Sequence, residues 1–350
     1  MNLLMFLLGL AALLAGAQLL VRGASRLALS FGISPLVVGL TVVAFGTSAP
    51  EAAVSAGAVL EGRGELAIGN VVGSNIFNVL FILGVSALVA PLVVHTQVIR
   101  QEVPLMIAAA LMLMALSWDG RIARLEAALL LGLLVAYTGF LVWQARKGGQ
   151  DASDYAEEMP RSQWDRHWSV QALLVFGGLG LLVLGSDWLV TAAVAFARSL
   201  GVSDVVIGLT IVAAGTSMPE VATSLLATFK GERDIAVGNV IGSNLFNILG
   251  CLGLSGVLTA QGLAVPAGVL NFDLWVMTAV QLACLPVFLT GRCIARWEGG
   301  LFVGYYAAYT AYLILAAQQH EALEAYSQLM MGFVVPLTIV TLAVVLIRRR

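Results

Sequence analysis

Residues 39–84 read GLTVVAFGTSAPEAAVSAGAVLEGRGELAIGNVVGSNIFNVLFILG, and they place the carboxylate Glu51 within an otherwise apolar run. A charged side chain at the centre of a membrane helix costs about 2.5–3.5 kcal/mol on insertion scales, so it is rare outside functional sites. Residues 208–253 repeat the pattern as GLTIVAAGTSMPEVATSLLATFKGERDIAVGNVIGSNLFNILGCLG. Glu220 takes the place of Glu51, and the separation, 220 − 51 = 169, holds without a gap. A duplicated, charged and glycine-interrupted apolar segment predicts the binding site of a transporter.

The composition settles the class of protein. Of 350 residues, 60% are hydrophobic and 11% are charged, against roughly 25% charged in a soluble domain. We therefore expect an all-α polytopic membrane protein. With only Lys147 and Lys230 as lysines, a nucleic-acid-binding surface is excluded. No G-x4-G-K-[ST] sequence occurs, which argues against coupling to ATP. Cys251, Cys284 and Cys293 form no C-x-x-C pair and are interpreted as small apolar residues.

Uncharged runs near the twenty residues of a membrane helix predict eleven spans. Their approximate ranges are 3–21, 35–60, 66–90, 103–117, 125–143, 169–190, 204–229, 235–258, 272–290, 299–317 and 327–347. The first is interpreted as a membrane helix rather than a signal peptide, because it has no basic n-region and Arg22 and Arg26 follow it.

The distribution of basic residues predicts the orientation. With the N-terminus outside and the C-terminus in the cytoplasm, 14 of the 18 Lys and Arg residues fall on the cytoplasmic side, as the positive-inside rule requires. The membrane would be a plasma membrane or a bacterial inner membrane. The first motif then occupies spans 2 and 3 and the second occupies spans 7 and 8. The chain crosses the membrane five times between a position in the first motif and the equivalent position in the second. Because five is odd, the two copies should have opposite orientations in the membrane.

The predicted organisation is two inverted five-helix halves, residues 1–143 and 169–317. Residues 318–350 add one C-terminal helix. The polar stretch 144–168 between the halves is interpreted as a solvated cytoplasmic linker, with a regulatory ion site among its acidic residues as the alternative. Glu102 and Asp187 lie near helix ends or in just one half, and we interpret them as interfacial.

The residue types within each motif suit a hard cation. The prolines of the GTSxPE sequences are expected mid-helix, where each frees carbonyl oxygens three to four residues earlier. The predicted carbonyls lie near Ala44, Thr47, Ala213 and Thr216. Further along each motif, a hydroxyl and an amide four residues apart share one helix face. These pairs are Ser74 with Asn78, and Ser243 with Asn247.

Structural roles remain open for some of these groups. Buried amides are common helix-packing devices, and this is the alternative interpretation for Asn70, Asn75, Asn239 and Asn244. A single intramembrane glutamate could be a buried structural group. Two glutamates in inverted copies, each with the same hydroxyl neighbours, favour a shared ion site.

The GTSxPE and GNxxGSNxFN pairs resemble the two alpha repeats of the cation/calcium antiporter superfamily, specifically its sodium/calcium exchanger branch. The resemblance implies a Ca²⁺ site formed by Glu51, Glu220 and the carbonyls of Thr47 and Thr216. It implies sodium sites from Ala44, Ser48 and Ser74 on one side, and from Ala213, Ser217 and Ser243 on the other. It implies no cofactor beyond the transported ions. Some relatives carry an aspartate where this chain has Asn247, so the likeness favours independence from potassium.

We therefore expect a secondary antiporter that exchanges Na⁺ for Ca²⁺ by alternating access, rather than an enzyme. Exchange of H⁺ for Ca²⁺, or for another divalent cation, through the same glutamates is the first alternative. An intramembrane hydrolase that uses the paired carboxylates as acid and base is the second. The lipid bilayer and the two cations are the expected partners, and the oligomeric state is not predicted.

Overall fold

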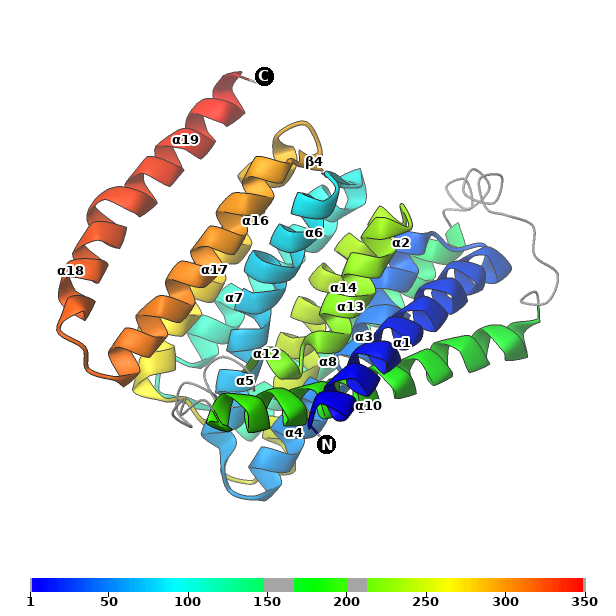
Figure 1. The fold of residues 1–350 in the computed structure, drawn as a ribbon, viewed down its shortest axis with the longest axis horizontal. Helices are drawn as coiled ribbons and strands as arrows, with labels where there is room; N and C mark the ends of the chain where they lie inside the picture. The colour runs from blue at the N-terminus through cyan, green and yellow to red at the C-terminus, as the bar shows by residue number, and fades with distance from the viewer. Residues whose placement is uncertain (1, 148–166, 200–212, 349–350) are drawn as a thin grey trace.

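The computed structural model describes residues 2–147, 167–199 and 213–348, and most of them are helical. Figure 1 shows one bundle of long helices, with the C-terminal helices α18 and α19 along one edge. The elements of the first half are α1 (Asn2–Phe31), α2 (Pro35–Val38), η1 (Gly39–Val43), α3 (Ala44–Thr47), α4 (Ala49–Leu60), α5 (Gly64–Phe77), η2 (Asn78–Leu83), α6 (Gly84–Val89), β1 (Leu92–Val93), η3 (Val98–Glu102), α7 (Val103–Leu116), β2 (Arg121–Ile122) and α8 (Arg124–Lys147).

The second half repeats this order, with η marking π-helical segments in both halves. Its elements are α10 (Trp168–Ser199), α12 (Ala213–Gly215), α13 (Met218–Phe229), α14 (Arg233–Leu245), η5 (Phe246–Cys251), α15 (Leu252–Leu258), β3 (Leu263–Ala264), η6 (Val269–Asp273), α16 (Leu274–Leu289), β4 (Cys293–Ile294) and α17 (Arg296–Ala317). The chain continues through α18 (Ala322–Leu329), η7 (Met330–Val334) and α19 (Val335–Arg348).

The described residues contain nine helices long and apolar enough to cross a membrane, or ten if the bent pair α2–α3 and α4 is one span. The remaining predicted span, 204–229, lies partly outside the described residues. Residues 144–147 continue α8, so the predicted linker begins later than expected. Most of that linker, residues 148–166, also falls outside the described residues.

Each motif covers two spans, and the second span of each motif lies at the centre of the bundle. In the most apolar 18 residues of each span, 94% are buried in Arg233–Leu258 and 78% in Gly64–Val89. The corresponding fraction is 6% in Arg296–Ala317 and zero in Ala322–Val345. In a membrane protein the outer helices expose apolar surface to lipid. An apolar sequence therefore does not show whether a helix lies inside the bundle or at its edge. The polar motif residues have to be shielded from lipid, and this sets which helices lie inside.

Each GTSxPE sequence breaks its helix, but not in the predicted way. The break falls at Ser48, with φ −84° and ψ 8°, and the axes of the flanking helices differ by 42°. Ser217 has nearly the same angles, φ −88° and ψ 9°. The prolines therefore lie in the first turn of a new helix, where the missing N–H is not needed, rather than mid-helix. Each break also creates a helix N-terminus inside the bundle, at the start of α4 in the first half and of α13 in the second.

Two short antiparallel ribbons mark the ends of the bundle. β1 pairs with β4, and β2 pairs with β3. The single crossing η3–α7 separates β1 from β2, so the β1–β4 end and the β2–β3 end lie on opposite sides. β1 and β3 are counterparts, because each follows a motif helix in its own half. Counterparts thus lie at opposite ends, as an inverted repeat requires.

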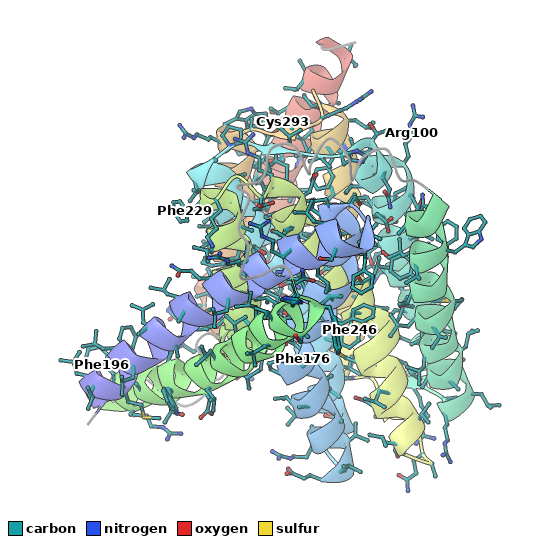
Figure 2. All side chains as sticks on the ribbon, turned by 90° about the vertical axis from the view of Figure 1, so that its right-hand side faces the viewer. Arg100, Phe176, Phe196, Phe229, Phe246 and Cys293 are labelled. Atoms are coloured by element: carbon teal, nitrogen blue, oxygen red, sulfur yellow. The ribbon has the colours of Figure 1, made fainter. Side chains whose placement is uncertain are left out.

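Helices α1 and α10 pack against each other through glycines, and Figure 1 and Figure 2 show them side by side, inclined to the rest of the bundle. A Cβ atom added at Gly178 would lie 2.8 Å from the Gly16 carbonyl oxygen, and one at Gly185 would lie 2.8 Å from that of Gly9. In the repeat, Gly178 is the equivalent of Gly9 and Gly185 is the equivalent of Gly16, because each pair is separated by 169 residues. The contact is therefore built from equivalent glycines, which let the two backbones approach closely.

Glu102, which the sequence interpretation places near a helix end, has a fully buried side chain. Its Oε2 accepts a hydrogen bond from Tyr137 Oη at 2.6 Å, and Oε1 accepts from the side-chain amides of Gln97 and Gln101 at 3.0 and 2.8 Å. The second half contains a counterpart, in which Tyr309 Oη donates to Asp273 Oδ1 at 2.7 Å. The sequence missed this pair because its separation, 273 − 102 = 171, departs from that of the motifs.

Replacement Tyr137→Phe should lower the free energy of unfolding by about 1.5–3 kcal/mol, because it removes a hydrogen bond to a buried carboxylate. Tyr305→Phe is the matched control, since that phenol donates to the neutral Thr338 hydroxyl at 2.7 Å. Its cost should be about 0.5–1.5 kcal/mol. Thermal unfolding in detergent measures both. If the two variants lost the same free energy of unfolding, the hydrogen bond from Tyr137 to Glu102 would be no stronger than one between neutral groups.

Candidate functional site

The two motif glutamates lie at equivalent positions at the buried helix N-termini. Glu51 is the third residue of α4 and Glu220 is the third residue of α13. Both side chains are fully buried, and the two carboxyl groups are close enough to interact electrostatically. Helix N-termini favour negative charge because their free N–H groups point outward. The broken helices thus explain how the fold holds two acidic groups within one apolar bundle.

Each carboxylate is bound by a serine of the other half. Ser217 Oγ donates to Glu51 Oε1 at 2.7 Å, and Ser48 Oγ donates to Glu220 Oε1 at 2.7 Å. These serines are the residues at which the two helices break. The sequence placed serine and glutamate in the same motif, but each hydroxyl faces the carboxylate of the other motif. The pair of bonds therefore joins the halves at the centre of the molecule.

Thr47 and Thr216 also reach across to the opposite half. Thr47 lies close to Glu220 and Thr216 close to Glu51. Thr47 Oγ1 donates to Asn239 Oδ1 at 3.0 Å, and Thr216 Oγ1 donates to Asn70 Oδ1 at 3.5 Å. The predicted threonine positions are thus beside the carboxylates, with their hydroxyls engaged by neighbouring amides.

Asn70 and Asn239 support the helices that carry the glutamates. Asn70 Nδ2 donates to the Glu51 carbonyl at 3.3 Å and to Ser55 Oγ at 3.0 Å. Asn239 makes the equivalent two bonds, at 3.5 and 2.9 Å, to Glu220 and Ser224. These contacts orient α4 and α13 rather than adding free ligand atoms. They correspond to the structural interpretation of these two amides.

Four asparagines form a second link between the halves. Asn78 Nδ2 donates to Asn244 Oδ1 at 3.0 Å, and Asn247 Nδ2 donates to Asn75 Oδ1 at 3.3 Å. All four side chains are buried. Asn78 begins η2 and Asn247 is the second residue of η5, and π-helical turns of this kind often occur at functional sites. Asn78 and Asn247, the amides that share a face with Ser74 and Ser243, are thus each paired with an amide of the opposite half.

The hydroxyls expected to bind sodium are grouped across the halves rather than within them. Ser217 Oγ lies 3.2 Å from Ser74 Oγ, and Ser243 Oγ donates to the Ala44 carbonyl at 3.4 Å. The expected sets kept Ser74 with Ala44 and Ser243 with Ala213. The structure differs because α14 packs against η1 and α3 of the first half, while α5 contacts α12 of the second. Ala213 begins α12, at the edge of the described residues.

Three buried oxygen atoms of this cluster have no hydrogen-bond partner among the described residues. They are Oε2 of Glu51, Oε2 of Glu220 and Oδ1 of Asn78. An unpaired buried acceptor is costly, so it needs a donor or a cation. In the described parts of the chain, no three His, Cys, Asp or Glu side chains gather as a metal cluster. The arrangement is thus two carboxylates among neutral oxygens, which suits a hard cation.

Sequence reasoning did not single out two methionines that flank the asparagines. Asn75 Nδ2 lies 3.5 Å from Met277 Sδ, and Asn244 Nδ2 lies 3.5 Å from Met106 Sδ. The two methionines belong to α7 and α16, outside the motifs. A methionine in an apolar helix gives no signal in the sequence, so only the packing of these helices reveals the contact.

Known proteins share both the sequence and the fold. Residues 1–143 and 170–315 match the family described as "Sodium/calcium exchanger protein". The chain is 42% identical over 309 residues to the putative antiporter CaxA of Alkalimonas amylolytica, with 85% of this chain and 95% of that protein covered. It is 34% identical over 345 residues to the sodium/calcium exchanger MaX1 of Methanosarcina acetivorans, with coverage of 89% and 98%.

Solved structures agree with this likeness. The sodium-calcium exchanger NCX_Mj, soaked with zero Na⁺ and Ca²⁺, superposes with a TM-score of 0.75 at 31% identity, covering 89% of this chain and 98% of that one. The all-helical polytopic fold is therefore confirmed, and the protein is a multi-pass transporter rather than an enzyme, which removes the hydrolase alternative. The chain belongs to the sodium/calcium exchanger family of membrane antiporters.

Proposed function

We propose that the protein exchanges Na⁺ for Ca²⁺ across the membrane, and that Ca²⁺ binds between Glu51 and Glu220. The reciprocal bonds Ser217–Glu51 and Ser48–Glu220 carry this proposal, because they bring two buried carboxylates together at the contact between the halves. Two carboxylates neutralise one divalent cation. The hydroxyls, amides and carbonyls around them are the further oxygen ligands that Ca²⁺ takes.

Sodium would replace Ca²⁺ at the same cluster. If Ca²⁺ left without replacement, two carboxylates would remain uncompensated in an apolar interior, at a cost of several kcal/mol per ion. Two groups of hydroxyls and carbonyls could hold Na⁺ beside them. The proposed groups are Ser48, Ser243 and Ala44 near Glu220, and Ser217, Ser74 and Ala213 near Glu51.

The two halves, residues 1–143 and 169–317, would alternate as inverted units that open the site to one side at a time. In this proposal, residues 318–350 form a peripheral addition. The β1–β4 end would face the cytoplasm, because Arg292 and Arg296 flank β4. Figure 2 shows Arg100 and Cys293 at this same end. The likeness to proteins named sodium/calcium exchangers supports sodium as the coupling ion.

The test is Ca²⁺ uptake by purified protein in sealed vesicles. A sodium gradient is imposed with the pH held equal on both sides by an ionophore. Uptake that follows the sodium gradient is expected. Uptake that requires a proton gradient and ignores sodium would replace this proposal with H⁺/Ca²⁺ exchange through the same glutamates.

Replacement Ser217→Ala should weaken sodium-driven uptake by raising the sodium concentration needed for half-maximal rate. The hydroxyl contacts both Glu51 and Ser74, and loss of a hydrogen bond to a charged group costs about 1.5–3 kcal/mol, or roughly 10–100-fold in affinity. Ser199→Ala is the control, because that hydroxyl is exposed and, among the described residues, donates to the Phe196 carbonyl. An unchanged sodium dependence in Ser217→Ala would exclude this serine from the sodium site.

A further inference from the structure

Met106 and Met277 are equivalent residues of the two halves, and each contacts an asparagine of the opposite half. Met106 lies in α7 and Met277 in α16, and both are fully buried. Their separation, 277 − 106 = 171, is that of Glu102 and Asp273, which lie just before the same two helices. Because α7 packs against α14 and α16 packs against α5, each sulfur reaches the motif helix of the other half.

The other methionines of α7 are not repeated in α16. At the separation of 171 residues, the equivalents of Met112 and Met114 are Ala283 and Leu285. Leucine and methionine replace each other readily where only volume matters. Among the methionines of α7, sulfur is therefore kept in both halves only at the position that contacts an asparagine.

The sulfur of Met277 sets the orientation of two amides in succession. A thioether can accept a hydrogen bond but cannot donate one. Asn75 Nδ2 donates to Met277 Sδ at 3.5 Å, which leaves Asn75 Oδ1 to accept from Asn247 Nδ2 at 3.3 Å. Asn247 consequently turns its own Oδ1 away from Asn75, and this oxygen accepts from Cys251 Sγ at 3.6 Å.

The same order of contacts is found at Met106. Asn244 Nδ2 donates to Met106 Sδ at 3.5 Å, and Asn244 Oδ1 accepts from Asn78 Nδ2 at 3.0 Å. Asn78 Oδ1 is then a buried oxygen with no partner among the described residues. The halves differ in one contact. Asn244 Nδ2 also lies 3.5 Å from the Asn75 carbonyl oxygen, whereas Met277 is the one partner of Asn75 Nδ2 in the described parts of the chain.

An amide that turns over exchanges its oxygen for an NH₂ group. Asn78 and Asn247 each lie one turn beyond a serine of their own motif. An oxygen at these two positions suits a cation, whereas an NH₂ group is a donor that repels one. We propose that Met106 and Met277 are positioning residues, which hold the asparagines in the orientation that leaves oxygen rather than nitrogen free at Asn78 and Asn247.

This inference rests on the proposed function, because it concerns how the chain orients amides around the same cluster. Neither methionine has to touch an ion. Without the sulfur, Asn75 Nδ2 is buried with no acceptor, and an unpaired buried N–H is rarer than an unpaired C=O. The Asn75 amide is therefore expected to turn over, and Asn247 then turns as well and presents its nitrogen. The effect should be smaller at Met106, because Asn244 keeps the Asn75 carbonyl as a second acceptor.

The first test replaces the sulfur at constant volume. Met277→Leu should raise the Ca²⁺ concentration for half-maximal sodium-driven uptake by roughly 2–10-fold, the loss of one neutral hydrogen bond. The maximal rate should stay close to that of the unmodified protein. Met106→Leu should show a smaller rise. Met114→Leu is the matched control, because Met114 is a buried methionine of α7 and the variant copies Leu285 of the other half.

An acceptor should rescue the site. Met277→Gln offers a side-chain oxygen to Asn75 Nδ2, so it should keep the half-maximal Ca²⁺ concentration near that of the unmodified protein. It is also the second variant if the leucine variant fails to fold. An unchanged half-maximal concentration in Met277→Leu, an equal rise in Met114→Leu, or a rise in Met277→Gln would overturn the inference.

A double-variant cycle tests the orientation itself. Aspartate presents oxygen whichever way it turns, so Asn247→Asp removes the dependence on the Asn75 amide. In that background, Met277→Leu should no longer weaken Ca²⁺ binding, measured as the Ca²⁺-dependent rise in unfolding temperature. A loss that persists in full would show that Met277 acts by packing alone. Failure of the proposed function would appear separately, as an absence of sodium-driven Ca²⁺ uptake in the unmodified protein.

Discussion

Glu51→Gln is expected to abolish sodium-driven Ca²⁺ uptake, and Glu220→Gln to do the same. Each replacement leaves a divalent cation with one compensating charge in an apolar interior. An uncompensated buried charge costs several kcal/mol, which corresponds to more than about 100-fold in affinity. Uptake into vesicles under a sodium gradient measures the loss. Because glutamine has nearly the same shape, the packing around the serine of the opposite half should be kept.

The folded state gives an independent readout of the same variants. Without Ca²⁺, each variant should unfold at a temperature equal to or above that of the unmodified protein, because a buried charge has been removed. Addition of Ca²⁺ should raise the unfolding temperature of the unmodified protein and not that of the variants. Glu102→Gln is the matched control, since Glu102 is equally buried but is bound by Tyr137. Uptake near the control level in Glu51→Gln would remove this residue from the site.

Gly178→Ala is expected to be strongly destabilising, although alanine is the better helix former. The added Cβ would lie 2.6 Å from Leu20 N and 2.8 Å from the Gly16 carbonyl oxygen, and both are backbone atoms. No side-chain rotation relieves such a contact, so α1 and α10 must move apart. Overpacking of this kind costs about 1–3 kcal/mol or more. Thermal unfolding in detergent measures the loss, and uptake assays show whether the displaced helices still support exchange.

The adjacent residue supplies the control. A Cβ atom at Gly177 would meet no atom within 4 Å. Gly177→Ala should therefore be neutral or stabilising by up to about 1 kcal/mol, through its higher helix propensity. If Gly178→Ala proved as stable as Gly177→Ala, the close approach of α1 and α10 would have no energetic importance.

These predictions depend on contacts of two kinds, which differ in how far the sequence reveals them. The identities of the acidic and hydroxyl-bearing site residues follow from the motifs, because the constant separation of 169 residues identifies equivalent positions. The glycines of α1 and α10 keep the same separation, yet nothing in the sequence says that Gly16 faces Gly178 rather than lipid. The Glu102–Tyr137 bond was missed altogether, since its counterpart departs from the constant separation.

The sequence alone determined that this is a membrane protein with a duplicated, acidic and hydroxyl-rich segment, because burying a charge in lipid is costly enough to leave a clear pattern. Spacing along one helix also determined that Ser74 shares a face with Asn78. Only the tertiary structure decided that Ser217 binds Glu51 and Ser48 binds Glu220. The physical reason is that helical periodicity sets which side chains point the same way, whereas the partner across the interface depends on how separate helices pack.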